Sequence, residues 1–110
     1  MDGPAFRLPA HLEVGALLRR VQQEGGFATV LAKGEPDAGT IMVVLANRDE
    51  PARAFERMPG PDGTRAWTLS RMAAPDSPAE FAQWLDRRSA QDRDLWIIEL
   101  DVPQGERFIP

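Results

Sequence analysis

The first apolar stretch of the chain has the spacing of an amphipathic helix. Between residues 10 and 24, apolar side chains such as Leu17 and Val21 recur every three or four positions, with Arg and Gln among the residues between them. Gly25 and Gly26 follow directly, and glycine commonly ends a helix because it accepts the left-handed backbone conformation. We therefore expect a helix over residues 10–24.

Two strands are expected after this helix. Residues 27–33 and 40–46 are mostly apolar, and the segment 34–39 between them contains the Gly, Pro and Asp residues that are typical of turns. After Thr40, residues 41–46 are apolar at successive positions, so both faces of this strand are apolar. Such a strand is predicted to lie centrally in a sheet, with other elements covering each face.

A β-hairpin is predicted next. Residues 52–58 and 64–70 flank a segment of turn-forming residues, 59–63. If the loop is symmetric, three pairs face each other: Met58 and Thr64, Arg57 and Arg65, and Phe55 and Trp67. This register places Phe55 and Trp67 on one face. The other face is expected to meet solvent and carries Ala54, Glu56, Ala66 and Thr68.

The clearest local signal is a second helix start. Ser77 can cap a helix, Pro78 suits its first turn, and Glu80 completes a capping box. The helix is expected to extend to about residue 88. Its buried side chains are predicted to be Phe81, Trp84 and Leu85.

The C-terminal part adds one or two strands. Residues 95–102 form a strand that is expected to present Trp96, Ile98, Leu100 and Val102 on one face. After a turn, residues 107–109 are expected to form a short edge strand. The fold class is therefore α+β: two helices packed on a mainly antiparallel sheet of four to six strands, in the order α-β-β-β-β-α-β, with 107–109 as an optional last strand.

Length and composition favour one globular domain over residues 1–110, with residues 1–6 irregular. The chain is 43% hydrophobic and 27% charged, which is ordinary for a globular protein. It has no Cys, which favours a reducing compartment, and we recognise no secretory signal and no apolar run of ~20 residues. A cytoplasmic protein without membrane contact is the simplest expectation.

Side chains that commonly perform catalysis are scarce. The chain has no Cys or Tyr, one His, one Lys and three Ser. No Ser lies in a Gly-x-Ser-x-Gly turn, and the His11-x-Glu13 pair lacks the Cys pair of zinc deaminases. We therefore expect no catalytic residues, no bound metal and no cofactor.

The predicted hairpin is basic. Arg57 and Arg65, if opposed, would destabilise a bare sheet, so something should compensate their charges. Carboxylates of the second helix, such as Glu80 or Asp86, or water could do so, with Phe55 and Trp67 simply packed in the core. Alternatively, the arginines bind an anionic ligand or a partner. The candidate binding residues are Arg53, Arg57, Arg65 and Arg71.

Carboxylates gather in the last strand region, and they offer a second candidate site. Asp92, Asp94, Glu99 and Asp101 could hold a hard cation such as Mg²⁺, although their spacing matches no known loop motif. A solvated strand face is the simpler interpretation. The net charge of −4 disfavours generic nucleic-acid binding.

Three stretches give the chain a family resemblance. They are residues 7–8 with Glu13-Val14-Gly15-Ala16-Leu17-Leu18-Arg19-Arg20, residues 24–28 with the turn 34–41, and Asp92-Arg93-Asp94-Leu95-Trp96-Ile97-Ile98-Glu99-Leu100. Through them the chain resembles domain-of-unknown-function family 1491, small bacterial proteins found mostly in alphaproteobacteria. The resemblance implies a cytoplasmic single-domain protein and supplies no activity, cofactor or site residue.

The leading functional hypothesis is a non-catalytic interaction or ligand-binding module. Its partner would be a protein or an anionic ligand at the basic hairpin. The alternatives are a metal-dependent enzyme using the carboxylates of 92–101, and an RNA- or DNA-binding accessory protein using the Arg-rich hairpin 53–71. A homo-oligomer could form through an edge strand, either in the hairpin or at 107–109.

Overall fold

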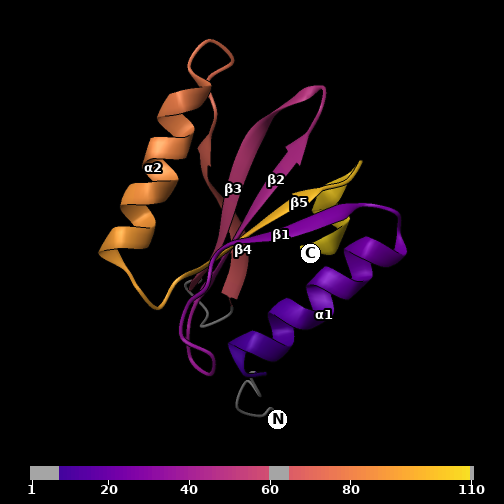
Figure 1. Ribbon diagram of the computed structural model, residues 1–110, viewed down its shortest axis with the longest axis vertical. Helices are drawn as coiled ribbons and strands as arrows, with labels where there is room; N and C mark the ends of the chain where they lie inside the picture. The colour runs from indigo at the N-terminus through magenta and orange to yellow at the C-terminus, as the bar shows by residue number, and fades with distance from the viewer. Residues whose placement is uncertain (1–7, 60–64, 110) are drawn as a thin grey trace.

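The computed structural model describes residues 8–59 and 65–109, and only the backbone of residues 58, 59 and 65. The predicted irregular segment 1–6 and the hairpin loop 60–64 lie outside the described residues. Helices and strands follow one another as expected (Figure 1). Their bounds are α1 Ala10–Gln23, β1 Phe27–Ala32, β2 Ile41–Asn47, β3 Glu50–Pro59, β4 Arg65–Met72, α2 Pro78–Gln91, β5 Trp96–Asp101 and the 3-10 helix η1 Gly105–Phe108.

The five strands form one mixed sheet in the order β1-β5-β2-β3-β4. Three of the four pairings are antiparallel, and β2 with β5 is parallel. The predicted α+β class, the mainly antiparallel sheet and the order α-β-β-β-β-α-β are therefore confirmed. The parallel pair arises because β5 returns, after α2, between the first two strands.

The predicted strand at 107–109 is wrong, because the chain forms η1 there instead. Gln104 adopts a left-handed conformation, with a φ of 55°, and the turn that follows folds the chain back onto the sheet. Phe108 and Ile109 are then both buried in the same core. A strand would have pointed these two consecutive side chains to opposite faces.

Each face of the sheet is covered by one helix, α1 on one side and α2 on the other (Figure 1). Side chains of β2 alternate between the two cores, as predicted for a central strand: Val43 lies in the α1 core and Val44 in the α2 core. The face of β5 that was predicted to be apolar lies entirely in the α1 core and carries Trp96, Ile98, Leu100 and, just beyond the strand, Val102.

The predicted hairpin register is wrong by two residues. Arg57 lies opposite Trp67, and Phe55 lies opposite Leu69. Pro59 still pairs, with Arg65, so the loop is centred one residue later than a symmetric 59–63 loop would be. Because the shift is even, each side chain keeps its face, and Phe55 and Trp67 both pack against the α1 core.

The opposite face of the hairpin was predicted to meet solvent. This prediction is wrong, because α2 covers that face. Ala54 is completely buried in the α2 core. Glu56 forms an ion pair with Arg88 of α2. The sequence pattern of small and polar residues was misleading because alanine is compatible with both a solvated face and a tightly packed one.

The second helix begins where predicted, but not with the predicted side-chain cap. Ser77 is the N-cap residue and Pro78 opens the helix, yet the Ser77 side chain makes no capping hydrogen bond. Instead the Glu80 backbone N–H donates to the Ser77 carbonyl oxygen at 3.1 Å. Since Pro78 has no N–H, the first turn has one donor fewer to satisfy.

Candidate functional site

The four predicted site arginines do not share one surface. Arg53 and Arg57 lie on the α1 side of β3, whereas Arg71 lies over the Trp84 ring of α2, with its guanidinium carbon 5.6 Å from the ring centre. The side chain of Arg65 is outside the described residues. Their separation follows from strand alternation: Arg53 and Arg57 are four positions apart on one face, and Arg71 pairs with Ala54 of the other.

Carboxylates neutralise Arg53 and Arg57, the two predicted site arginines that lie on the α1 side. Arg53 bonds to Glu106 at 2.8 Å, and Arg57 bonds to Glu13 at 2.7 Å. The partners belong to η1 and α1, not to the second helix, where the sequence suggested Glu80 or Asp86. Side chains of the fold therefore compensate the charges of Arg53 and Arg57, but they come from the face of the sheet that α1 covers and not from the face that α2 covers.

Arginines also cover aromatic rings throughout the molecule. A guanidinium over an aromatic face gains electrostatic attraction and shields apolar surface with its stem. On the α1 side the distances from guanidinium carbon to ring centre are 5.6 Å for Arg53 and Phe55, 4.9 Å for Arg57 and Trp67, 5.3 Å for Arg20 and Phe108, and 4.8 Å for Arg107 and Phe108.

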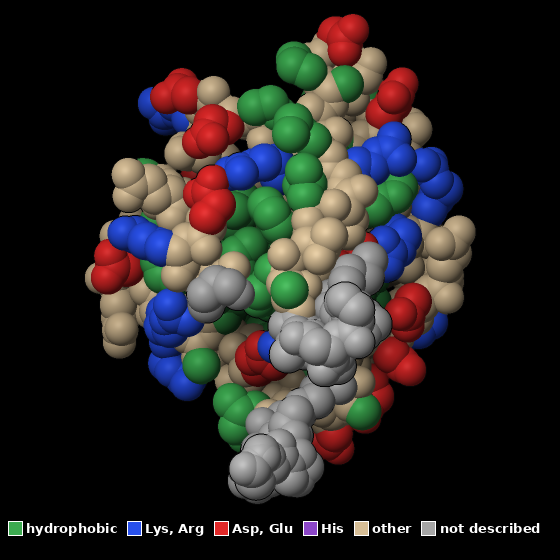
Figure 2. All heavy atoms as spheres, turned by 180° about the vertical axis from the view of Figure 1, so that it is seen from behind, with side chains coloured by type: hydrophobic (Ala, Val, Ile, Leu, Met, Phe, Trp, Pro, Cys, Tyr) green, Lys and Arg blue, Asp and Glu red, His purple; other side chains and the backbone are tan. Residues whose placement is uncertain are grey.

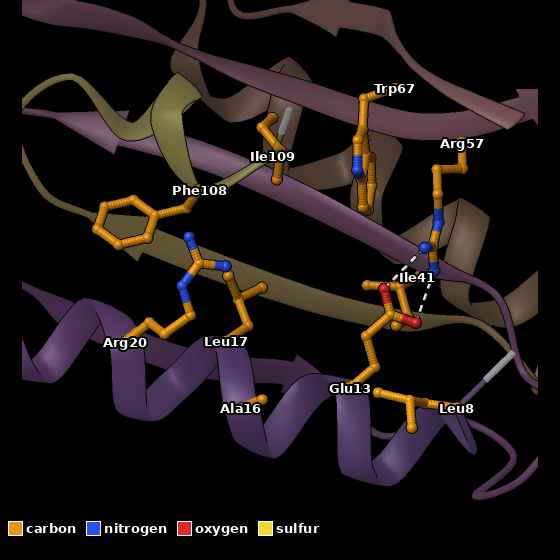
Figure 3. Close-up of a pocket in the computed structure, with 10 residues that line it drawn as sticks. All are labelled: Leu8, Glu13, Ala16, Leu17, Arg20, Ile41, Arg57, Trp67, Phe108 and Ile109. Atoms are coloured by element: carbon orange, nitrogen blue, oxygen red, sulfur yellow. Dashed lines mark hydrogen bonds and ion pairs between the residues drawn. The ribbon is translucent and has the colours of Figure 1, made fainter.

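A cleft of about 380 Å³ opens beside Arg57 (Figure 3). It lies between α1, the sheet and the segment after η1, and hydrophobic side chains gather on this side of the molecule between the C-terminal segment and the β3–β4 hairpin (Figure 2). Its described lining is Leu8, Glu13, Ala16, Leu17, Arg20, Ile41, Arg57, Trp67, Phe108 and Ile109.

Two of the charged groups in the cleft, Arg57 and Glu13, hold each other in position. Arg57 reaches from β3 to Glu13 and makes two parallel bonds, Nη1 to Oε2 at 2.7 Å and Nη2 to Oε1 at 2.9 Å. Trp67 projects from β4 beside this pair, and Arg20 extends from α1 toward Phe108 (Figure 3). Two arginines and one glutamate leave one net positive charge among the described lining residues.

A wider hollow of about 530 Å³ lies near the start of α2, but it is a weaker candidate. It is more open, and its walls come from the β2–β3 turn, the start of β3, the segment between β4 and α2, and the first turn of α2. No ion pair or side-chain hydrogen bond joins two of its described lining residues. We therefore take the cleft beside Arg57 as the candidate site.

The described lining of the cleft includes no His, Ser, Thr or Lys side chain. His11 is exposed on α1, and its Nδ1 lies 2.9 Å from the Pro36 carbonyl oxygen. Across residues 8–59 and 65–109, no three His, Asp or Glu side chains lie close enough to hold a metal ion. Asp92 instead accepts the Asp94 backbone N–H at 3.1 Å.

The sequence did not identify Glu13, Arg20 or Phe108 as site residues. One signal was present: Glu13, Ala16, Leu17 and Arg20 are spaced at i, i+3, i+4 and i+7, so they line one stripe of α1. Two charged residues within such a stripe indicate that part of it does not enter the core. Their partners on β3 and η1 are distant in sequence, and only the tertiary structure identifies them.

On the face of the sheet that α2 covers, an ion pair between Arg88 of α2 and Glu56 of β3 joins the helix to the sheet. Glu56 accepts hydrogen bonds at 2.7 Å from both terminal nitrogens of Arg88, and a further one from the Ser70 hydroxyl. The hydrogen bonds from Arg88 lower the pKa of Glu56, assisted by Ser70 and opposed by burial. The same contact raises the pKa of Arg88.

Replacing Glu56 with glutamine is expected to destabilise the protein by about 1 kcal/mol at pH 7, since the pair is partly solvated. Folding lowers the pKa of Glu56, so its ionised carboxylate stabilises the fold at pH values above the pKa that Glu56 has in the unfolded chain. This stabilisation is lost as the pH falls through the pKa of Glu56 in the folded protein. Urea denaturation should therefore show that the difference in unfolding free energy between the wild type and Glu56→Gln becomes smaller in acid. Asp86→Asn, which removes an exposed carboxylate of α2, should have little effect. A loss of stability in Glu56→Gln that stays constant at all pH values would contradict the lowered pKa of Glu56.

Three solved structures are similar to this chain. One is the crystal structure of a DUF1491 family protein from Caulobacter crescentus CB15, with 31% sequence identity, a TM-score of 0.78, and coverage of 94% of this chain and 95% of that chain. Another is an NMR structure of a DUF1491 family protein from Caulobacter crescentus CB15, with 30% identity, a TM-score of 0.76, and coverage of 93% of this chain and 92% of that chain. The chain is also similar to protein Atu0922 from A. tumefaciens in a solution structure, with 28% identity, a TM-score of 0.74, and coverage of 94% of this chain and 93% of that chain. No curated protein matches.

Neither described helix has the length and apolar character needed to cross a membrane.

The protein family described as "Protein of unknown function (DUF1491)" matches this chain over residues 8–110, which include every element from α1 to η1. The resemblance noted in the sequence is therefore confirmed: the chain belongs to the DUF1491 family.

Proposed function

We propose that this protein is a non-catalytic binding module and that its ligand site is the cleft between α1 and the sheet. The observation that carries the proposal is the position of Arg57: Glu13 fixes its guanidinium beside Trp67, in a cleft of about 380 Å³. Cavities of this size, with apolar walls and a few fixed polar groups, are typical of small-molecule sites.

The lining favours a small ligand with an apolar body and one negative charge. Trp67 and Phe108 offer aromatic surface, while Arg20 and Arg57 outnumber Glu13 by one charge. A carboxylate would balance that charge and could share the Arg57 guanidinium with Glu13. Of the predicted site residues, the proposal therefore uses Arg57 alone.

This proposal is favoured over nucleic-acid binding by the same arginines. A nucleic-acid backbone needs several cationic groups along one surface, and here Arg53 and Arg57 are paired with carboxylates while Arg71 lies on the other side of the sheet. The net charge of −4 adds a general repulsion. We take the protein to act in the cytoplasm, consistent with its lack of cysteine.

Calorimetric titration with phenylbutyrate and naphthylacetate tests the proposal. At ~0.3 kcal/mol per non-hydrogen atom, probes of this size should bind with a Kd of about 1 mM. Trp67→Ala should weaken binding about tenfold or more by removing the aromatic wall. Glu13→Gln should strengthen it severalfold, because Arg57 then loses its competing carboxylate.

Arg71→Ala is the matched control, since it removes an arginine stacked on a tryptophan outside the cleft and should leave the Kd unchanged. Circular dichroism would confirm that each variant is folded. Equal loss of binding in Arg71→Ala and Trp67→Ala would place the probe elsewhere. Binding that Glu13→Gln weakens would show that the carboxylate does not share Arg57.

A further inference from the structure

The outer edge of β1 has the properties of a strand that pairs with another chain. β1 is one of the two edge strands of the sheet, and its residues Phe27–Ala32 include no charged side chain and no proline. Phe27 is 74% exposed, Val30 40% and Leu31 46%. Edge strands of soluble proteins usually carry charges or proline that discourage pairing, and here the one such device is a bulge between Val30 and Ala32.

The opposite edge is different. β4 begins with Arg65 and carries Arg71, so two copies that paired through β4 would bring together strands of like charge. β1 has no charge to repel an identical strand. The self-compatible edge of this sheet is therefore β1.

We propose that β1 pairs antiparallel with β1 of a second copy of this chain. A two-fold axis perpendicular to the sheet must pass through a residue position, because opposed side chains share a face. With the axis at Thr29, Ala28 of each copy lies opposite Val30 of the other, and Phe27 approaches Leu31 at the bulge, so that the most exposed apolar side chains of the strand cover each other.

Neighbouring positions of the axis fit less well. An axis at Ala28 would place Leu31 opposite Gly25, and one at Val30 would place Phe27 opposite Lys33. Centring on Thr29 also places exposed Lys33 opposite Gly25 of the other copy, next to the exposed Glu24 at the end of α1, whose carboxylate lies 3.4 Å from Arg107 of its own chain. Charges of opposite sign therefore lie near each other at both ends of the pairing. The result joins two five-stranded sheets into one continuous sheet.

The pairing is independent of the proposed ligand site. The cleft is lined by α1, the segment after η1 and strands β2 to β4, whereas β1 lies at the other edge of the sheet. Two copies joined through β1 would both keep the cleft accessible. Failure of ligand binding would therefore leave this inference unaffected, and the reverse also holds.

Light scattering on the full chain tests the association. Its mass should rise from 12.2 kDa toward twice that value as protein concentration increases to about 1 mM, where a pairing free energy of ~4 kcal/mol gives half-saturation. Thr29→Glu should abolish the rise. Thr68→Glu is a matched control, because Thr29 and Thr68 are both exposed on edge strands and each lies opposite a glutamate, Glu99 or Glu56.

A cysteine cross-link tests the register. The chain has no native cysteine, so Thr29→Cys introduces a single thiol beside its own copy at the two-fold axis, within reach of a disulfide. Oxidised glutathione should link Thr29→Cys rapidly into a covalent dimer, and Thr68→Cys much more slowly. A wild-type mass of 12.2 kDa at all concentrations, or equally fast linking of both variants, would overturn the proposal.

Discussion

Replacing Gly34 with alanine is expected to destabilise the protein by about 3 kcal/mol, the upper part of the usual range for forcing extra atoms into a packed site. An added Cβ would collide with the backbone carbonyl of Asp94. That carbonyl cannot move freely, because it accepts the Glu35 backbone N–H at 3.1 Å. Urea denaturation followed by tryptophan fluorescence would measure the loss.

Gly15→Ala is the control for this change. Gly15 lies within α1, where a Cβ would meet only the end of the Arg19 side chain at 3.5 Å. Alanine is the better helix former by ~0.5–1 kcal/mol, so this variant should be more stable than the wild type. If Gly34→Ala were as stable as the wild type, the backbone at Gly34 could not lie in close contact with Asp94 and Leu95, just before β5.

Truncating Ile98 to alanine should cost about 3–4 kcal/mol. Ile98 is completely buried in β5, between β1 and β2, and faces the α1 core. Few neighbours in such a position can move to fill the space. The midpoint of urea denaturation should fall accordingly, with the slope of the transition unchanged.

Val30→Ala provides the comparison within the same strand pair. Val30 lies directly opposite Ile98 but is 40% exposed on the edge strand. Its truncation should cost less than about 1 kcal/mol, because water already contacts the removed methyl groups. Equal losses for the two variants would mean that β5 is not the interior strand of the sheet.

The sequence predicts those features that depend on local periodicity. The helix at 10–24 ends one residue early, and the apolar run at 40–46 forms a strand buried on both faces, because burial of a repeating apolar pattern decides both. Turn residues also separated the strands correctly. Local turn chemistry does not fix the loop centre to a single residue, so the hairpin register was wrong.

Long-range packing was beyond the sequence signals. Nothing in residues 95–102 indicates that β5 inserts between β1 and β2, since an apolar strand suits any interior position. Arg57 was predicted as a binding residue, but Glu13 lies 44 positions earlier in the chain, and no local signal links the two. The candidate cleft therefore exists only as a property of the packed fold.

The most direct test of the proposed binding function is a nuclear magnetic resonance titration that follows the indole N–H of Trp67. Naphthylacetate should shift this signal saturably, with a Kd of about 1 mM, while those of Trp84 and Trp96 stay in place. The neutral amide of the same compound should bind at least severalfold more weakly, since it offers no charge to Arg57. Equal binding of acid and amide, or no saturable shift at Trp67, would contradict an anion-binding cleft.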